Sequence, residues 1–145
     1  MIPDFIEGGI LPPGIHEANI DEITQRYGGV NSLKSLRRLK LIKSLKEFLQ
    51  FIKSYAIEIY IDGSFITSKL SPNDVDVFVV LSASFYQNGQ AMLRLADFLS
   101  LSKSNHLHIQ HFSKGHKDIH GMMNWFTHTR PPFEQEKGIS LWESP

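Results

Sequence analysis

The stretch that decides the fold is residues 58–81, which read EIYIDGSFITSKLSPNDVDVFVVL. Two runs rich in β-branched and aromatic residues flank a polar excursion, so we expect one strand over residues 57–62 and a second over residues 74–81. The turn after the first strand opens at Gly63 and Ser64, since glycine tolerates the backbone angles of a tight turn. The sequence therefore predicts a central hairpin around which the rest of the chain packs.

Two aspartates stand at the start of the second expected strand. Successive side chains of a strand point to opposite faces, so Asp74 and Asp76 share one face while Val75 and Val77 share the other. Like charges this close repel each other unless a cation lies between them. Carboxylate oxygens are the ligands that hard divalent cations prefer. The pattern therefore predicts a divalent metal held by the two aspartates.

A turn at Gly63 and Ser64, followed by Asp74, Val75 and Asp76 on a hydrophobic strand, resembles the signature of the nucleotidyltransferase superfamily that includes DNA polymerase beta. The chain is most similar to the minimal, single-domain members of that superfamily. A looser similarity to small bacterial and phage proteins of this fold is carried by LPPG at residues 11–14 and FTHTR at residues 126–130. The resemblance implies that the paired aspartates hold Mg²⁺ or Mn²⁺ and that a nucleoside triphosphate is the substrate.

The resemblance also implies that the turn holds the phosphates of the nucleotide. A glycine lets the backbone come close to a ligand, and a turn can present several amide donors to an anion. We therefore expect the backbone amides of Gly63 and Ser64, with the Ser64 hydroxyl, to hold the triphosphate. Thr67 and Lys69 lie in the excursion between the two strands and could add a hydroxyl and a cation.

The chain departs from the superfamily pattern at one position. Active members place a third carboxylate on a later strand, beside the first two. The best candidate strand here is residues 106–112, which contains no acid, and the aligned position is His108, or His106 or Gln110 if the register slips. A histidine could serve as metal ligand or general base near neutral pH. Alternatively, the third ligand is lost and the protein binds nucleotide without turning it over.

The fold class expected is α/β: one domain over residues 1–145, with a small, mixed, twisted sheet, helices mainly on one face and the site at its open edge. Residues 1–18 are rich in proline and glycine and form an extended arm. Asn19 with an acid three places on, Glu22, predicts a helix start. The other expected elements are helices over residues 32–55, 90–101 and 117–126, and strands over residues 106–112 and, at an edge of the sheet, 138–142.

The helix expected over residues 32–55 is amphipathic and strongly basic. Its apolar positions recur every three or four residues, at Leu33, Leu36, Leu39, Ile42, Leu45, Phe48, Leu49 and Ile52. Its polar positions carry many cations and one acid: Lys34, Arg37, Arg38, Lys40, Lys43, Lys46, Glu47 and Lys53. This charge pattern indicates either a solvated helix face or a docking surface for phosphates or an acidic protein.

The overall composition bounds the partners and the compartment. The chain has 15 basic and 15 acidic residues, so its net charge gives no support to nucleic-acid binding. The sequence has no cysteine, which excludes disulfides and thiolate chemistry and is compatible with a reducing cytoplasm. No apolar run approaches the roughly 18 residues of a membrane span. We therefore expect a cytoplasmic protein with no membrane contact.

Two functions remain open from the sequence. The first is a minimal Mg²⁺-dependent nucleotidyltransferase that moves a nucleoside monophosphate to a hydroxyl of a protein or RNA partner. The resemblance implies a toxin–antitoxin or defence module, with a toxin or effector as the protein partner. The second is a catalytically weakened binding module, an antitoxin, sensor or scaffold that acts through the arm and the basic helix. In the second case, charge reversal at Arg37 and Arg38 is expected to break partner association.

Overall fold

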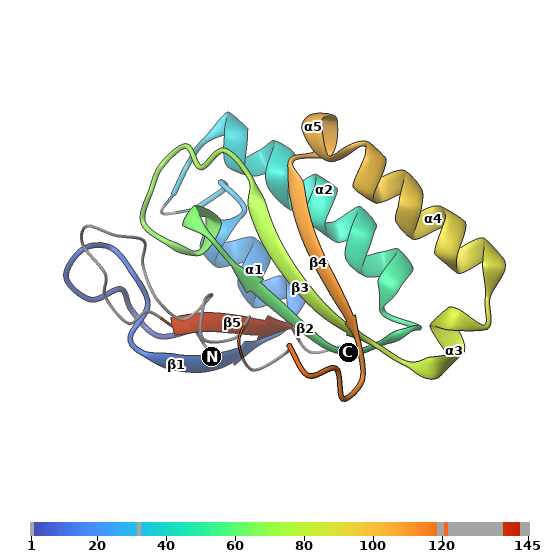
Figure 1. Ribbon diagram of the computed structural model, residues 1–145. Helices are drawn as coiled ribbons and strands as arrows, with labels where there is room; N and C mark the ends of the chain where they lie inside the picture. The colour runs from blue at the N-terminus through green and yellow to red at the C-terminus, as the bar shows by residue number, and fades with distance from the viewer. Residues whose placement is uncertain (1, 32, 119–120, 122–137, 143–145) are drawn as a thin grey trace.

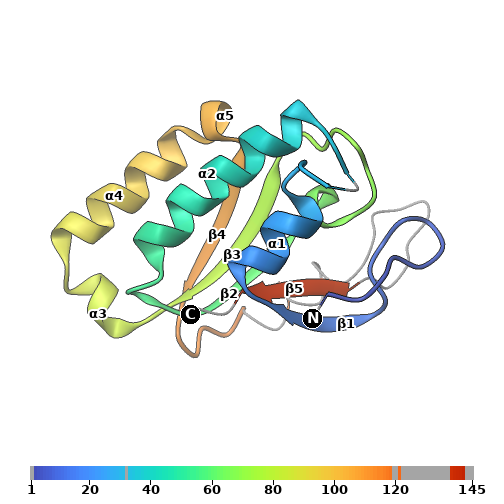
Figure 2. The same cartoon turned by 180° about the vertical axis from the view of Figure 1, so that it is seen from behind.

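The computed structural model describes residues 2–31, 33–118, 121 and 138–142. The described strands form one sheet in the order β1-β5-β2-β3-β4, and α1, α2 and α4 all cover the same face of this twisted sheet (Figures 1 and 2). The strands are β1 (Gly14–Ala18), β2 (Ala56–Asp62), β3 (Val75–Leu81), β4 (Leu107–Ser113) and β5 (Gly138–Trp142). The helices are α1 (Ile20–Tyr27), α2 (Leu36–Ile52), α3 (Ala83–Tyr86), α4 (Gly89–Ser100), α5 (Ser102–Asn105) and a single 3-10 turn, η1 (Ser64–Ile66).

The sheet is mixed, which confirms the expected α/β class with helices on one face. β2 and β3 form the predicted antiparallel hairpin, while β3 and β4 run parallel. A parallel pair needs a crossover connection, and α3, α4 and α5 provide it by carrying the chain back along the helical face of the sheet. β5 pairs in parallel with β1 and antiparallel with β2. The hydrophobic core lies between the helices and β2, β3 and β4.

Capping residues set the helix boundaries. The predicted start of α1 is confirmed: the Asn19 side chain accepts from the Glu22 amide at 2.9 Å, and the Glu22 carboxylate accepts from the Asn19 amide at 3.0 Å. α2 is shorter than predicted at both ends, and its start is set by the Ser35 hydroxyl, which accepts from the Arg38 amide at 3.3 Å. Asn88 caps α4 in the same way, accepting from the Ala91 amide at 3.0 Å. α3 and α5, each one turn long, were not predicted.

Two predictions about the ends of the chain are corrected. Residues 14–18, expected to be part of an extended arm, form β1 and pair with β5. β5 was expected at an edge of the sheet but lies between β1 and β2, so the described edges are β1 and β4. The helix expected over residues 117–126 lies largely outside the described residues. In the described part of the chain, no helix has the length and apolar character needed to cross a membrane.

The buried face of α2 differs from the one that the apolar pattern predicted. Leu36 is 80% exposed and Leu39 40% exposed, although both were expected in the core. Arg38, expected on the polar face of the helix, is fully buried. The buried stripe runs through Arg38, Leu41, Ile42, Leu45, Phe48, Leu49 and Ile52. The guanidinium of Arg38 therefore occupies a core position at the first turn of the helix.

Arg38 is satisfied in the core by backbone carbonyls. Its Nη1 donates to the Tyr27 carbonyl at 3.2 Å and to the Phe65 carbonyl at 2.7 Å. Its Nη2 donates to the Thr67 carbonyl at 2.8 Å, and Nε donates to the Lys69 carbonyl at 3.2 Å. Burial lowers the pKa of Arg38 to about 10, so the guanidinium stays charged at neutral pH. Arg38 thus ties α1 and the loop after η1 to α2.

We predict that Arg38→Met lowers the free energy of unfolding by about 3 kcal/mol or more, because it leaves four carbonyls without their shared donor. Chemical unfolding in urea measures this change. The matched control is Lys46→Met, which removes an exposed cation from the same helix and is expected to stay within about 0.5 kcal/mol of wild type. Equal stability of the two variants would contradict the structural role of Arg38.

Candidate metal centre

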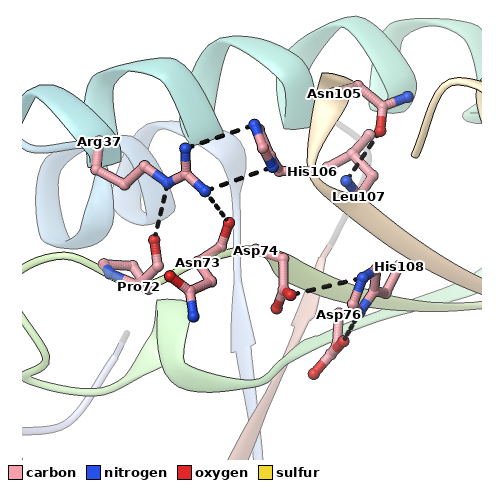
Figure 3. Close-up of polar contacts among 9 residues, drawn as sticks. All are labelled: Arg37, Pro72, Asn73, Asp74, Asp76, Asn105, His106, Leu107 and His108. Carbon is pink, nitrogen blue, oxygen red and sulfur yellow. Dashed lines mark hydrogen bonds and ion pairs between the residues drawn. The ribbon is translucent and has the colours of Figure 1, made fainter. Parts of the chain in front are cut away.

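Three metal-ligating side chains meet at one end of the sheet, where β3 and β4 begin (Figure 3). The parallel register pairs Asp76 with His108, so their side chains lie on the same face. Asp74 stands two residues earlier and shares that face. The alternating residues Val77 and Ile109 are buried and point toward the helices. The cluster therefore lies on the face of the sheet opposite α1, α2 and α4.

The imidazole of His108 lies between the two carboxylates. Its Nε2 is 3.5 Å from Oδ2 of Asp74, and its Nδ1 is 3.4 Å from Oδ1 of Asp76. One ligand atom from each of the three residues lies within 4.8 Å of the others. The side chain of His108 is 57% exposed, against 29% for Asp74 and 23% for Asp76. The cluster is therefore anchored by the aspartates and open to solvent on the side of the histidine.

These donors suit a divalent cation. Each ring nitrogen of His108 faces a different aspartate, so a single ion would be bound by one of the two nitrogens together with carboxylate oxygens. Two carboxylates supply the charge that a hard cation needs. An imidazole nitrogen shifts the preference from Mg²⁺ toward first-row transition metals such as Mn²⁺ or Zn²⁺. The donor set therefore fits Mn²⁺ better than Mg²⁺.

Gly63 brings the predicted phosphate-binding turn against the metal cluster. Its φ is +86°, a conformation that side chains rarely permit. A Cβ atom at this position would lie 2.5 Å from Oδ2 of Asp76. Only a glycine lets the turn pass this close to the carboxylate. The close approach physically links the two halves of the motif that the sequence singled out.

The residues after Gly63 serve the loop as well as the candidate site. The Thr67 hydroxyl donates to the Ser64 carbonyl at 2.7 Å and accepts from the Lys69 amide at 3.2 Å, so it is used within the loop. Among the described contacts, the hydroxyl and the amide of Ser64 donate no hydrogen bond. The Lys69 side chain is exposed, and no described contact joins it to the aspartates. Ser64 is therefore the donor best placed to meet a ligand.

Arg37 holds the other end of the same loop, immediately before Asp74. Its Nε donates to the Pro72 carbonyl at 3.2 Å and its Nη2 to the Asn73 carbonyl at 2.6 Å (Figure 3). Arg37 and Arg38, both on α2, therefore hold the excursion between β2 and β3 in place. Burial therefore removes Arg38 from the solvated face or docking surface that the charge pattern indicated, whereas Arg37 is half-buried and its guanidinium also lies against the ring of His106.

His106 does not join the cluster, although alternation on a strand suggested that it would point the same way as His108. It precedes β4 and has a left-handed backbone with φ of 59°. Its ring lies against Arg37 instead, with Nε2 3.4 Å from Nη1 and Nδ1 3.4 Å from Nη2. Gln110 lies on the same face as His108, two residues further along β4 and away from the aspartates. The register therefore selects His108.

Asp62 is a neighbouring carboxylate that the sequence analysis did not assign. It ends β2 directly opposite Asp76 in the antiparallel register, on the same face, and is only 3% exposed. Directly opposite side chains have Cβ atoms about 5 Å apart. The sequence held a signal for this residue, because the last residue of the first strand of a hairpin lies opposite the start of the second strand. Asp62, Asp76 and His108 form a row across three strands.

Comparison with known proteins gives one match. A sequence model described as a family of unknown function, DUF6932, matches residues 3–141. Comparisons with curated proteins and with solved structures find no match. The likeness to nucleotidyltransferases therefore rests on the residues of this chain.

We predict that Gly63→Ala destabilises the fold by about 1–3 kcal/mol and displaces the Asp76 carboxylate, because a side chain is strained at this φ and collides with Oδ2. Urea unfolding measures the first effect. Gly89→Ala is the control: nothing lies within 4 Å of a Cβ there, and alanine favours the helix by up to about 1 kcal/mol. Tolerance of alanine at residue 63 would show that the close approach is not required.

Proposed function

The chain belongs to the DUF6932 family of unknown function, and we propose from its own site that it is a divalent-metal-dependent nucleotidyltransferase. The observation that carries this proposal is the position of His108, beside both aspartates on the strand parallel to theirs. That is where the resemblance places a third acidic ligand. The strand, glycine-serine turn, second strand and later parallel strand follow in the order that the resemblance implies.

The proposed reaction transfers a nucleoside monophosphate to an acceptor hydroxyl. The acceptor oxygen forms a bond to the α-phosphorus, the bond from that phosphorus to the β-phosphate bridging oxygen breaks, and pyrophosphate leaves. The acceptor proton passes to a base or to water. A bound divalent cation supplies charge neutralisation for the phosphates. The hydroxyl and amide of Ser64 are the donors that hold the departing phosphates.

His108 has two possible roles in this reaction, as a metal ligand or as the base that takes the acceptor proton. Both roles need a ring nitrogen without a proton, since a protonated imidazole has no acceptor. The two ring nitrogens face different aspartates. This favours the ligand role, because one nitrogen can donate to one carboxylate while the other binds an ion shared with the second. The acceptor that we propose is a protein or RNA partner in the cytoplasm.

The binding-module alternative has less support. It was expected to act through the N-terminal arm and the basic helix, with charge reversal at Arg37 and Arg38 as its test. Both guanidinium groups donate to backbone carbonyls, and Arg38 is fully buried. Charge reversal at these positions would therefore disrupt the loop that carries Asp74, whether or not a partner binds. In the enzymatic proposal, the two arginines hold the loop that carries Asp74.

The first test of the proposal is metal binding. We predict that Mn²⁺ binds wild type and that Asp74→Asn or His108→Ala weakens binding by more than about 100-fold, because each removes a direct ligand. Titration calorimetry, or the electron paramagnetic resonance signal of free Mn²⁺, measures the affinity. Asp97→Asn removes an exposed carboxylate of α4 and serves as the control. Binding that survives both ligand changes would exclude the cluster as the metal site.

The second test is transfer itself, with each of the four nucleoside triphosphates labelled at the α-phosphate and incubated with cell protein or RNA. We predict labelled acceptor with wild type and none with Asp74→Asn, while circular dichroism shows that the variant is folded. His108→Asp should shift the metal preference from Mn²⁺ toward Mg²⁺ by about tenfold or more, because it replaces nitrogen with a hard oxygen ligand. Labelling that persists in Asp74→Asn would contradict the proposal.

A further inference from the structure

A groove of about 430 Å³ runs between α2 and α5 on the helical side of the sheet. We call it the α2–α5 groove, and Figure 2 shows the two helices side by side. One end of the groove is formed by Arg37 and His106, close to where β3 and β4 begin (Figure 3). The lining residues are Arg37, Lys40, Lys43, Ser44, Glu47, Leu101, Ser104, Asn105 and His106.

The groove concentrates positive charge on a chain whose net charge is zero. Arg37, Lys40 and Lys43 are spaced by three residues along α2, so they lie along one face of the helix. Lys40 and Lys43 are exposed, and no ion pair involves either among the described residues. The acid in the lining, Glu47, lies one turn beyond Lys43. The end of the groove nearest the metal centre is therefore cationic.

Arg37 is a fixed cation at that end. Its guanidinium is held by the Pro72 and Asn73 carbonyls, so little side-chain entropy remains to be lost when it meets an anion. Asn73 precedes the ligand Asp74. The groove and the metal centre are thus joined through three consecutive residues of one loop, although they open on different faces of the sheet.

We propose that the α2–α5 groove binds a phosphate group, held by Arg37, Lys40 and Lys43. Arginine and lysine with a nearby hydroxyl donor are the side chains that recognise phosphate oxygens, and Ser44 provides such a hydroxyl. The side chains of Ser104 and Asn105 donate to the Leu101 and Phe98 carbonyls. Phe, Tyr and Trp do not occur in the described lining, so the site recognises phosphate rather than a stacked base. This inference rests on the proposed function for the source of the phosphate, which we take to be the backbone of an RNA acceptor, because the triphosphate of the nucleotide is held at Ser64 on the other face of the sheet.

The test uses metal-free protein in EDTA, so that it does not depend on the aspartate cluster. The probes are inorganic triphosphate, followed by calorimetry, and a fluorescein-labelled 12-nucleotide RNA, followed by anisotropy at low salt. The variant is Lys40→Glu with Lys43→Glu. The matched control is Lys46→Glu with Lys53→Glu, which changes the net charge equally and alters two exposed lysines of the α2 segment outside the groove.

We expect the groove variant to lose on the order of tenfold or more in affinity for the RNA, while the control stays near wild type. Loss for inorganic triphosphate with RNA affinity unchanged would contradict the RNA backbone as the source. No binding of either probe by folded wild type, or equal loss in variant and control, would overturn the proposal. Asp74→Asn should leave this binding unchanged, which separates a failure of the groove from a failure of the metal centre.

Discussion

The rest of the site depends on the hydrogen bonds that the buried guanidinium of Arg38 donates to backbone carbonyls. The loop between β2 and β3 spans residues 63–74 and contains little regular structure beyond η1. Ordering a loop of this length costs conformational entropy, and its exposed backbone offers few contacts to offset that cost. Arg38 supplies hydrogen bonds to three of its carbonyls from inside the core. Arg37 adds two more just before Asp74, so the loop is held at both ends by one helix turn.

The loop brings a turn that only glycine permits against a group of carboxylates. Asp62, Asp74 and Asp76 lie on one face, and the hairpin register places two of them directly opposite each other. Gly63 has a φ that side chains rarely adopt, and a Cβ atom there would collide with the carboxylate of Asp76. Backbone conformations restricted to glycine recur where the chain approaches a ligand closely, which is a reason to locate function at this end of the sheet.

Local signals in the sequence were sufficient for the hairpin, the α1 cap and the paired aspartates. Each depends on residues within a few positions of one another, as the Asn19 and Glu22 cap shows. The parallel register that brings His108 to Asp76 could be proposed only through the resemblance, because the partners are 32 positions apart. The interior position of β5 was missed for the same reason: a short terminal strand carries no signal of its neighbours in the sheet.

Arg38 was missed although a signal existed. It precedes Leu41 by three residues and Leu45 by seven, which places it on the buried face of α2. A charged side chain is rarely buried unless it is paired, so the prediction counted only apolar residues and placed Leu36 and Leu39 on the buried face. Here the partners are backbone carbonyls of a distant loop. No pattern within the helix could reveal those partners, so the charge pattern indicated an exposed position for a residue that is buried.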